Sequence, residues 1–205
     1  MVNLDTFSTP ITPIEEDELI KRINKSLTDG DLRRYLGGSV GDNIIKYSDL
    51  VNYNSITELL PKQKDYKIIL IENDDFNKGH WVAIMRYFDK QNDDKDTIEY
   101  FNSYGKKPDA QKSVIGACRY PVLGQTENYL SQLIKKRPKD LTYIWNKKAF
   151  QKQKQGINTC GRWLVLRLTL MRDMDMGLKE FQSVIKMNAK KTGLPLDALV
   201  SVYIS

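Results

Sequence analysis

The sequence is poor in the residues from which metal sites and disulfide frameworks are built. Its 205 residues include two cysteines, Cys118 and Cys160, and a single histidine, His80. Two cysteines cannot form a disulfide framework, and one histidine argues against a zinc site made of Cys and His. We therefore expect both thiols to be free and no metal or other cofactor to be needed.

Long apolar runs are also missing. No stretch approaches the roughly 20 apolar residues that span a bilayer, and the opening "MVNLDTFSTPITPIEEDELI" lacks the charged and apolar regions of a signal peptide. We expect a protein kept in an intracellular compartment, without a membrane partner. Neither repeats nor a Gly/Ser linker divides the chain, so a single domain over residues 1–205 is predicted, with a helical segment at 1–40 and the core at 41–205.

Positive charge exceeds negative charge in the sequence. Lysine and arginine number 32 against 26 acidic residues, which gives a net charge of +6. Basic clusters occur in "IKKRPK" (134–139) and "NKKAFQKQK" (146–154). Nucleic acid is a partner that fits this balance, although lysine-rich loops are more often only solvated.

The spacing of apolar residues predicts an α+β fold. Strands are predicted at 66–73, 80–88, 96–103 and 141–146. Helices are predicted at 13–27, 55–61, 124–137, 160–174 and 179–191, with a final short helix or strand at 194–205. The result is a central mixed or antiparallel sheet flanked by helices.

Strand 80–88 alternates along its length. One face carries His80, Val82, Ile84, Arg86 and Phe88, and the other carries Trp81, Ala83, Met85 and Tyr87. A polar connection joins this strand to strand 96–103, which predicts an antiparallel hairpin with a long turn.

Polar residues are predicted to mark the helix ends. Ser55 and Thr126 are placed to cap the helices that follow them, and Asn158 or Thr159 can cap the next one. The sequence Thr-Asp-Gly at 28–30 is expected to end the first helix.

Cys160 and Gly161, in "NTCGRW" (158–163), are the first residues of a predicted amphipathic helix. Main-chain N–H groups and the helix dipole at this position lower a thiol pKa and favour the nucleophilic thiolate of Cys160. Gly161 costs about 0.5 to 1 kcal/mol relative to alanine, which fits a close approach of the substrate backbone. The alternative is that Cys160 is a buried apolar side chain. Arg162 and Arg167 have no predicted role.

His80 is the only imidazole that could serve Cys160 as a base. It begins a strand, from which it can project into a cleft, and Trp81 could cover its ring. Asn102, in "YFNSYG", ends the paired strand, and its carbonyl oxygen can hold the far ring nitrogen of the base. The alternatives are an exposed histidine at a strand end and an asparagine that only begins a turn.

Acyl transfer also needs hydrogen-bond donors for the developing oxyanion. One well-placed donor contributes about 3 to 4 kcal/mol. The main-chain N–H of Cys160 is one candidate, and the side chain of Gln151, Gln153 or Gln155 is another. At least two of these glutamines must belong to a solvated loop.

The order His80, Asn102, a loop glutamine and Cys160 resembles the adenain-like cysteine proteases. This family includes the adenovirus maturation proteinase, its relatives in large DNA viruses and virophages, and the proteases for ubiquitin-like proteins. The resemblance rests on "GHWVAI" (79–84), "IEYFNSYG" (98–105) and "NTCGRW", with the viral branch indicated by "IIKYSDLVNYNSITELLP" (44–61) and "TGLPLDALVSVYIS" (192–205). It spans roughly residues 40 to 205.

The resemblance implies a papain-like fold of the adenain type with the catalytic Cys160 at a helix N-terminus, His80 as general base and Asn102 as its orienting partner. It also implies a viral endopeptidase that processes capsid and core precursors during virion maturation. We would then expect a monomer in the host cytoplasm or viral factory that is packaged in the virion. DNA or a peptide could stimulate it, as DNA does in some relatives.

Two positions depart from the family pattern. Many members have an acid where this chain has Asn102, so here the base is oriented without a negative charge to stabilise the imidazolium. The adenovirus spacing points to Gln153 for the oxyanion hole, whereas the apolar residue directly before Gln151 favours that glutamine. We assign Gln151, with Gln153 as the alternative. By the same resemblance, Cys118 could join a partner through a disulfide, or it could be a small buried residue.

Two rival functions remain open at this stage. One is a protease for ubiquitin-like modifiers on the same fold. The other is a catalytically inactive, basic nucleic-acid-binding protein.

Overall fold

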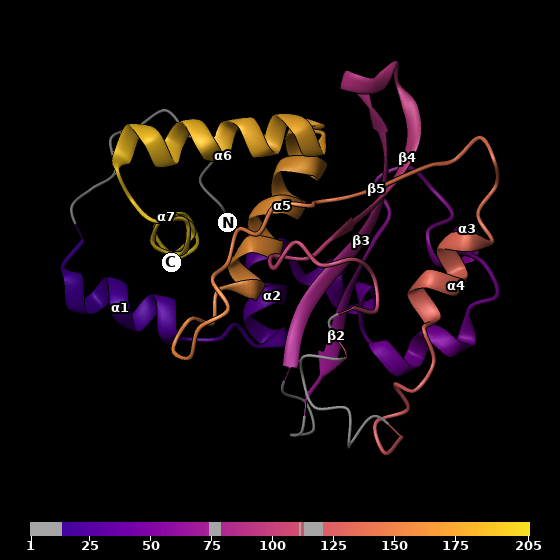
Figure 1. Ribbon diagram of the computed structural model, residues 1–205, viewed down its shortest axis with the longest axis horizontal. Coiled ribbons are helices and arrows are strands. Elements are labelled where there is room, and N and C mark those ends of the chain that lie inside the picture. Colours follow the sequence, from indigo (N-terminus) through magenta and orange to yellow (C-terminus); the bar gives the residue numbers. More distant parts are fainter. Residues whose placement is uncertain (1–13, 74–78, 111, 113–120) are drawn as a thin grey trace.

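A computed structural model of the protein describes residues 14–73, 79–110, 112 and 121–205. It is an α+β structure in which a five-stranded sheet, ordered β1-β2-β3-β4-β5, lies between helices (Figure 1). The strands are β1 Ile44–Lys46, β2 Tyr66–Glu72, β3 Gly79–Asp89, β4 Lys95–Phe101 and β5 Thr142–Trp145. The central three strands are antiparallel, and each outer strand is parallel to its neighbour. A mixed sheet flanked by helices is therefore confirmed.

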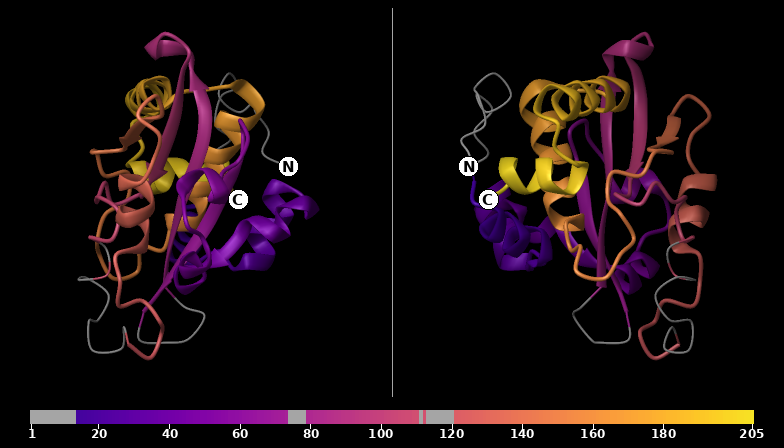
Figure 2. Two further views of the ribbon diagram at one scale, coloured as in Figure 1. Left: turned by 90° about the vertical axis from the view of Figure 1, so that its right-hand side faces the viewer. Right: turned by 60° about the vertical axis from the view of Figure 1, so that its left-hand side comes forward.

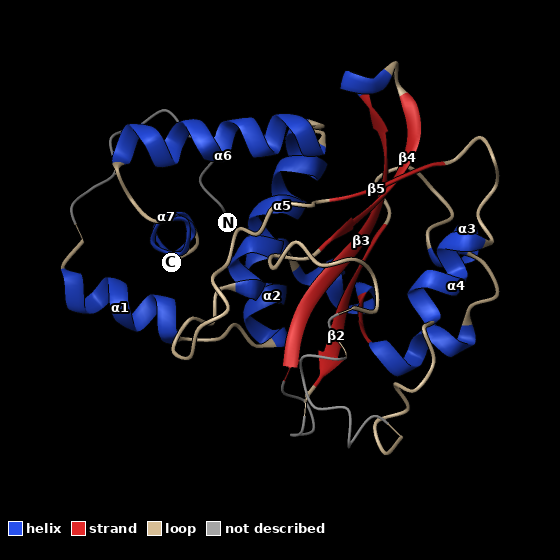
Figure 3. Ribbon diagram, viewed as in Figure 1, coloured by secondary structure: helices blue, strands red, loops and turns tan. Residues whose placement is uncertain are grey.

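Helices cover both faces of the sheet, as the blue elements on either side of the red strands show in Figure 3. The α-helices are α1 Glu16–Asn24, α2 Asp29–Leu36, α3 Ile56–Leu59, α4 Tyr129–Lys135, α5 Cys160–Met174, α6 Leu178–Thr192 and α7 Leu196–Tyr203, and the 3₁₀ helices are η2 Gly38–Asn43, η3 Tyr47–Asn52 and η4 Lys90–Asn92. α2, α5, α6 and α7 lie on one side of the sheet, and α3 and α4 lie on the other (Figure 1). No helix within the described ranges is long and apolar enough to cross a bilayer.

The alternation predicted for β3 divides the core in two. Trp81 and Met85 belong to a cluster with the buried side of α5, whereas Val82 and Ile84 belong to a second cluster with α3 and α4. The predicted hairpin with β4 is also confirmed, but its turn is short because β3 continues to Asp89. This turn projects from one end of the sheet in both views of Figure 2.

Glycine is required where β3 begins. Gly79 pairs with Glu72 of β2, and a Cβ atom at position 79 would lie 2.0 Å from the carbonyl oxygen of Ile71. Any larger residue would push the two strands apart. The close approach of the two strands places His80 as the second residue of β3. At this end of the sheet its side chain can reach beyond the strands.

The N-terminal region differs from the prediction. Thr-Asp-Gly at 28–30 does not simply end one helix, because Thr28 caps a second one, α2. Its hydroxyl accepts the N–H of Asp31 at 3.1 Å, and the Asp31 carboxylate accepts the N–H of Thr28 at 3.0 Å. This reciprocal pattern is a capping box. Leu32 and Leu36 of α2 are buried in the main core.

Other local predictions have mixed outcomes. Ser55 caps α3 as expected, since its hydroxyl accepts the N–H of Glu58. Thr126 does not cap α4, because that helix begins later, after Asn128. β1 was not predicted, since a strand of three residues in a glycine-rich stretch has too little pattern to recognise. The C-terminal segment is a helix, α7.

α5 is buried around its whole circumference and is not amphipathic. Every residue from Cys160 to Met171 is buried, including Arg167. The guanidinium of Arg167 donates to both carboxylate oxygens of Glu99 at 2.8 and 2.6 Å, and both side chains are fully excluded from water. The hydroxyl of Tyr87 donates to the same carboxylate at 2.5 Å. This ion pair lets a charged residue face the sheet in the middle of α5.

We predict that Arg167→Met lowers the free energy of unfolding by about 3 to 5 kcal/mol, because it leaves the Glu99 carboxylate buried without a counter-ion. Restoring neutrality with Glu99→Gln in the same chain should recover part of the loss. Urea denaturation measures both effects. Arg22→Met, which breaks an exposed pair with Glu18, is the control and should cost less than about 1 kcal/mol. Equal losses at the two arginines would contradict the prediction.

Candidate active site

One cleft collects the residues expected to carry the chemistry. It is lined by His80, Gln151, Gln153 and Cys160, together with Tyr104. These residues come from β3, the turn after β4, the segment after β5 and the start of α5, so segments far apart in the sequence meet there.

Asn102 lies behind the cleft and binds the imidazole. Nε2 of His80 is 2.9 Å from Oδ1 of Asn102, and both side chains are buried. The same oxygen accepts the main-chain N–H of Tyr104 at 2.9 Å. Since a main-chain N–H can only donate, the atom that faces it must be the amide oxygen, and Nε2 of His80 must carry the hydrogen. Nδ1 is therefore the nitrogen with the free lone pair.

The main chain of Asn102 is held by Asn146, which directly follows β5. Oδ1 of Asn146 accepts the N–H of Asn102 at 2.8 Å, and Nδ2 donates to the carbonyl oxygen of Asn102 at 2.6 Å. Asn146 is fully buried. This role of Asn146 is not evident in the sequence, because only the parallel pairing of β4 and β5 brings the residue next to Asn102.

Tyr104, and not Trp81, covers the imidazole. The rings of Tyr104 and His80 stack with centroids 4.4 Å apart and planes 12° apart. Burial is the main cause that raises the pKa of Tyr104 to about 12, so its hydroxyl stays protonated at neutral pH. The expected role of Trp81 is wrong: its Nε1 donates to the carbonyl oxygen of Leu27 at 2.9 Å, and its ring belongs to the core on the other face of β3.

Burial also shifts the pKa values of His80 and Cys160. Loss of water lowers the pKa of His80 to about 4, only partly opposed by the hydrogen bond with Asn102. Burial raises the pKa of the Cys160 thiol, while the main-chain N–H groups of Trp81, Gly161 and Cys160 itself act in the opposite direction. The expectation of a lowered thiol pKa is therefore wrong in direction, because desolvation outweighs the helix start.

The main-chain N–H groups around the thiol of Cys160 also indicate where its sulfur lies. Cys160 is the first residue of α5 and is 9% exposed. The main-chain N–H of Trp81 lies close enough to the thiol to affect its pKa. Sγ of Cys160 is thus beside the part of β3 that carries His80.

Gly161 serves packing and not the approach of a substrate. A Cβ atom at this position would lie 2.9 Å from Cβ of Leu27 and 3.4 Å from the Trp81 ring. The role that we expected for Gly161 is therefore wrong. Glycine here lets the segment before α2 and the tryptophan of β3 close against the first turn of α5.

Neither predicted cap of α5 makes a capping hydrogen bond. The hydroxyl of Thr159 donates to Oδ1 of Asp197 at 2.6 Å, and the amide of Asn158 donates to the carbonyl oxygen of Asn24 at 2.7 Å. Both residues instead tie the head of α5 to other helices.

The two candidate glutamines differ sharply in their surroundings. Gln151 is 3% exposed; its Oε1 accepts the hydroxyl of Ser103 at 2.7 Å, and its Nε2 donates to the carbonyl oxygen of Ile157 at 3.0 Å. Gln153 is exposed at the rim. A primary amide has two N–H bonds, so Gln151 keeps one for a ligand in the cleft. Fixed donors are what an oxyanion hole needs.

Each residue of "NSYG" (102–105) contributes to the site. Asn102 binds His80, Ser103 binds Gln151, and Tyr104 stacks on the imidazole. Gly105, with φ of 68°, lets the main chain of residues 147–149 approach, since a Cβ would lie about 2.9 Å from it. The turn is evident in the sequence, whereas the roles of Ser103 and Tyr104 are not.

Two further predictions concern metals and Cys118. The described residues hold no group of three His, Cys, Asp or Glu side chains that could bind a metal ion. Cys118 lies outside the residues that the structure describes, so its predicted roles stay predictions.

Comparison with known proteins identifies a viral relative. The chain is 35% identical to uncharacterized protein V9 of the Sputnik virophage over 133 residues, which are 65% of this chain and 70% of the virophage protein. The chain belongs to the family of this virophage protein. The sequence matches no profile of a known protein family. Membership of a virophage family agrees with the viral branch indicated by the sequence. Because the relative is uncharacterized, only the geometry of the site bears on the chemistry.

We predict that the imidazole of His80 titrates with a midpoint near pH 4, well below the usual 6.5 for histidine. Because the chain has one histidine, its NMR signals need no assignment. Since the unfolded chain binds the proton first, native stability should fall as the pH drops from about 6.5 to 4, by about 3 kcal/mol in all.

The matched variant for this measurement is Asn102→Asp. A carboxylate in contact with Nε2 favours the imidazolium, so the midpoint should rise. A midpoint near 6.5 in the wild type, or no upward shift in Asn102→Asp while the amide spectrum stays dispersed, would count against the buried neutral pair.

Proposed function

We propose that the protein is a cysteine endopeptidase with a papain-like mechanism on an adenain-type fold. The observation that carries the proposal is the shared cleft of Cys160 and His80, in which Asn102 orients the base from behind. A nucleophile, a base and an orienting group in this order are what such a mechanism needs. Gln151 adds a fixed donor at the same cleft.

In this mechanism Nδ1 of His80 accepts the thiol proton while Sγ of Cys160 attacks the carbonyl carbon of the scissile bond. The oxyanion receives hydrogen bonds from the main-chain N–H of Cys160 and from Gln151. The imidazolium then protonates the leaving amine, which leaves a thioester on Cys160. Water hydrolyses the thioester with His80 again as the base, and the thiol is restored.

The shifted pKa values favour neutral groups in the resting site. Burial disfavours both the thiolate and the imidazolium, and Asn102 offers no charge to stabilise the latter. We therefore propose that proton transfer accompanies the attack on the substrate, and that no stable thiolate–imidazolium pair precedes it.

The proposed substrates are capsid and core precursors that are cleaved during virion maturation. Kinship with a virophage protein supports a viral setting, and the cleft suits an extended peptide. The corresponding location is the viral factory or host cytoplasm, followed by packaging in the virion. A protease for ubiquitin-like modifiers is the rival with the same chemistry, and incubation with tagged modifiers separates the two.

A basic surface around β5 favours nucleic acid as an additional partner. Nζ of Lys107 and of Lys147 lie 5.6 and 5.1 Å from the ring centroid of Trp145, and the guanidinium of Arg137 lies 5.8 Å from that of Tyr143. The Tyr143 and Trp145 rings stack on each other. Cations interleaved with stacked aromatic rings are suited to phosphates and bases. In this proposal the surface would hold the enzyme on packaged DNA.

We predict that Cys160→Ala abolishes cleavage of a co-expressed capsid precursor, and that His80→Ala does the same. Mass spectrometry of the precursor and of iodoacetamide-treated enzyme follows both cleavage and thiol labelling. Cys118→Ala is the matched control, which should retain cleavage. Processing that persists unchanged in Cys160→Ala would overturn the protease assignment.

We predict that the two glutamines respond differently to substitution. Gln151→Ala should lower kcat by about 10²- to 10³-fold, the usual effect of losing one oxyanion donor, and Gln153→Ala should change it by less than about threefold. Gln151→Glu keeps an acceptor for Ser103 but loses the N–H bonds, so it should be as slow as Gln151→Ala. Equal, mild losses at positions 151 and 153 would remove the oxyanion assignment.

A further inference from the structure

The end of α1 and the segment that joins it to α2 are fastened to the candidate active site. Four of the five main-chain carbonyl groups from Ile23 to Leu27 accept hydrogen bonds from it. The acceptors are Ile23 at 2.9 Å, Asn24 at 2.7 Å, Lys25 at 2.5 Å and Leu27 at 2.9 Å. The donors are the N–H and side-chain amide of Asn158, the guanidinium of Arg162 and the indole of Trp81.

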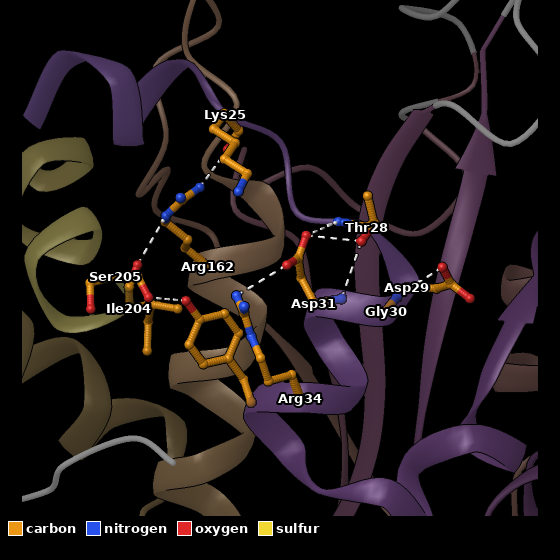
Figure 4. A network of polar contacts seen from close by, with 10 residues as sticks. Lys25, Thr28, Asp29, Gly30, Asp31, Arg34, Arg162, Ile204 and Ser205 are labelled. Carbon is orange, nitrogen blue, oxygen red and sulfur yellow. Dashed lines mark hydrogen bonds and ion pairs between the residues drawn. The ribbon is translucent and has the colours of Figure 1, made fainter. Parts of the chain in front are cut away.

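These donors flank both reacting residues. Asn158 and Arg162 stand two residues before and after Cys160, and Trp81 directly follows His80. Arg162 is 2% exposed and bridges Lys25 to the carbonyl oxygen of Ile204 at the end of α7, as Figure 4 shows. The segment is thus positioned by the same elements that position the nucleophile and the base.

Ser26 is the exception in this series. It is exposed, lines the cleft with His80 and Cys160, and has no hydrogen bond to another residue in the described parts of the chain. Lys25, directly before it, and Thr28, two residues after it, have extended backbone conformations. A solvated main chain at a cleft offers an N–H and a carbonyl group for pairing, as the edge of a sheet does.

We propose that the main chain of Ser26 is a docking site for the main chain of an extended peptide substrate. The proposal rests on the proposed function and names how the substrate is held there: by strand-like pairing with N–H and C=O of residue 26, independent of the substrate side chain at that point. Ser26 then lines the cleft together with residues of the loop at 153–158.

The chain on both sides of Ser26 is held in place before substrate arrives. The neighbouring carbonyl groups are already bound, and the capping box of Thr28 and Asp31 fixes the chain just beyond it (Figure 4). A preformed partner loses little conformational entropy on binding. Gly156 lets the loop at 153–158 approach the end of α1, since a Cβ at position 156 would lie 3.2 Å from Oδ1 of Asn24.

The test removes the main-chain donor with Ser26→Pro. Lys25 has φ of −81° and ψ of 116°, which a following proline favours, and φ of Ser26 is not positive. We expect kcat/KM for peptides to fall roughly threefold to tenfold, the effect of one hydrogen bond. Ser26→Ala loses only the hydroxyl and should fall well short of this loss. Asp29→Pro, at the first position of α2 where proline is accepted, is the matched control.

A second measurement identifies the partner group on the substrate. Peptides in which successive main-chain carbonyl groups are replaced by thiocarbonyls, which are weaker hydrogen-bond acceptors, should show one position where the wild type loses activity and Ser26→Pro loses nothing further. Additive losses at every position, or full activity in Ser26→Pro, would overturn the proposal. Alkylation of Cys160 by iodoacetamide should be equally fast in both proteins. If the wild type itself cleaves no peptide, it is the protease assignment that fails.

Discussion

The hydrogen bond from Nε2 of His80 to Oδ1 of Asn102 joins two side chains that are withdrawn from water. Because the acceptor is a neutral amide, this bond offsets only part of the desolvation of an imidazolium. The ring is therefore held in one tautomer and in its neutral state. The stacked ring of Tyr104 and the clamp of Asn146 both act on this pair, so the chemistry of the cleft depends on it.

The neighbourhood of Asn102 gives a physical reason for an amide in place of an acid. Nδ2 of Asn102 is buried and has no hydrogen-bond partner among the described residues. A carboxylate there would be a buried charge with the imidazolium of His80 as its partner, and burial disfavours that imidazolium as well. Three residues earlier on β4, Glu99 is buried as well, and Arg167 neutralises it. Both acids of β4 face an arginine: Glu99 pairs with Arg167 of α5, and Asp96 pairs with Arg86 of β3.

Sheet topology explains which parts of the site could be predicted. β3 runs antiparallel to β4, and β4 runs parallel to β5. The start of β3 and the C-terminal ends of β4 and β5 therefore lie at the same end of the sheet. The alternating pattern and the hairpin were readable in the sequence, and they predict that His80 and Asn102 meet. The pairing of β4 with β5 joins segments some 45 residues apart and leaves no periodic trace. Asn146 and Ser103 were missed for this reason.

The types of the residues at the start of α5 also led to two wrong predictions, one for Cys160 and one for Gly161. Helix position was expected to set the thiol pKa, and the glycine was expected to face a substrate. Burial determines the direction of the Cys160 pKa shift, and contacts with Leu27 and Trp81 explain the glycine at position 161. Both the burial and the contacts depend on how deeply α5 lies in the protein. The sequence does not reveal that depth, because an apolar stripe alone does not show whether the polar positions Arg162 and Arg167 are also covered.

The N-terminal segment shows how polar contacts can replace a hydrophobic anchor. None of the nine residues of α1 is buried, so apolar packing contributes little to its attachment. The last carbonyl groups of a helix lack partners within it, and here Asn158 donates to two of them, on Ile23 and Asn24. A helix held in this way is fixed in position only while the head of α5 is in place. The order of the chain around Ser26 and the order of Cys160 are consequently one cooperative property of the fold.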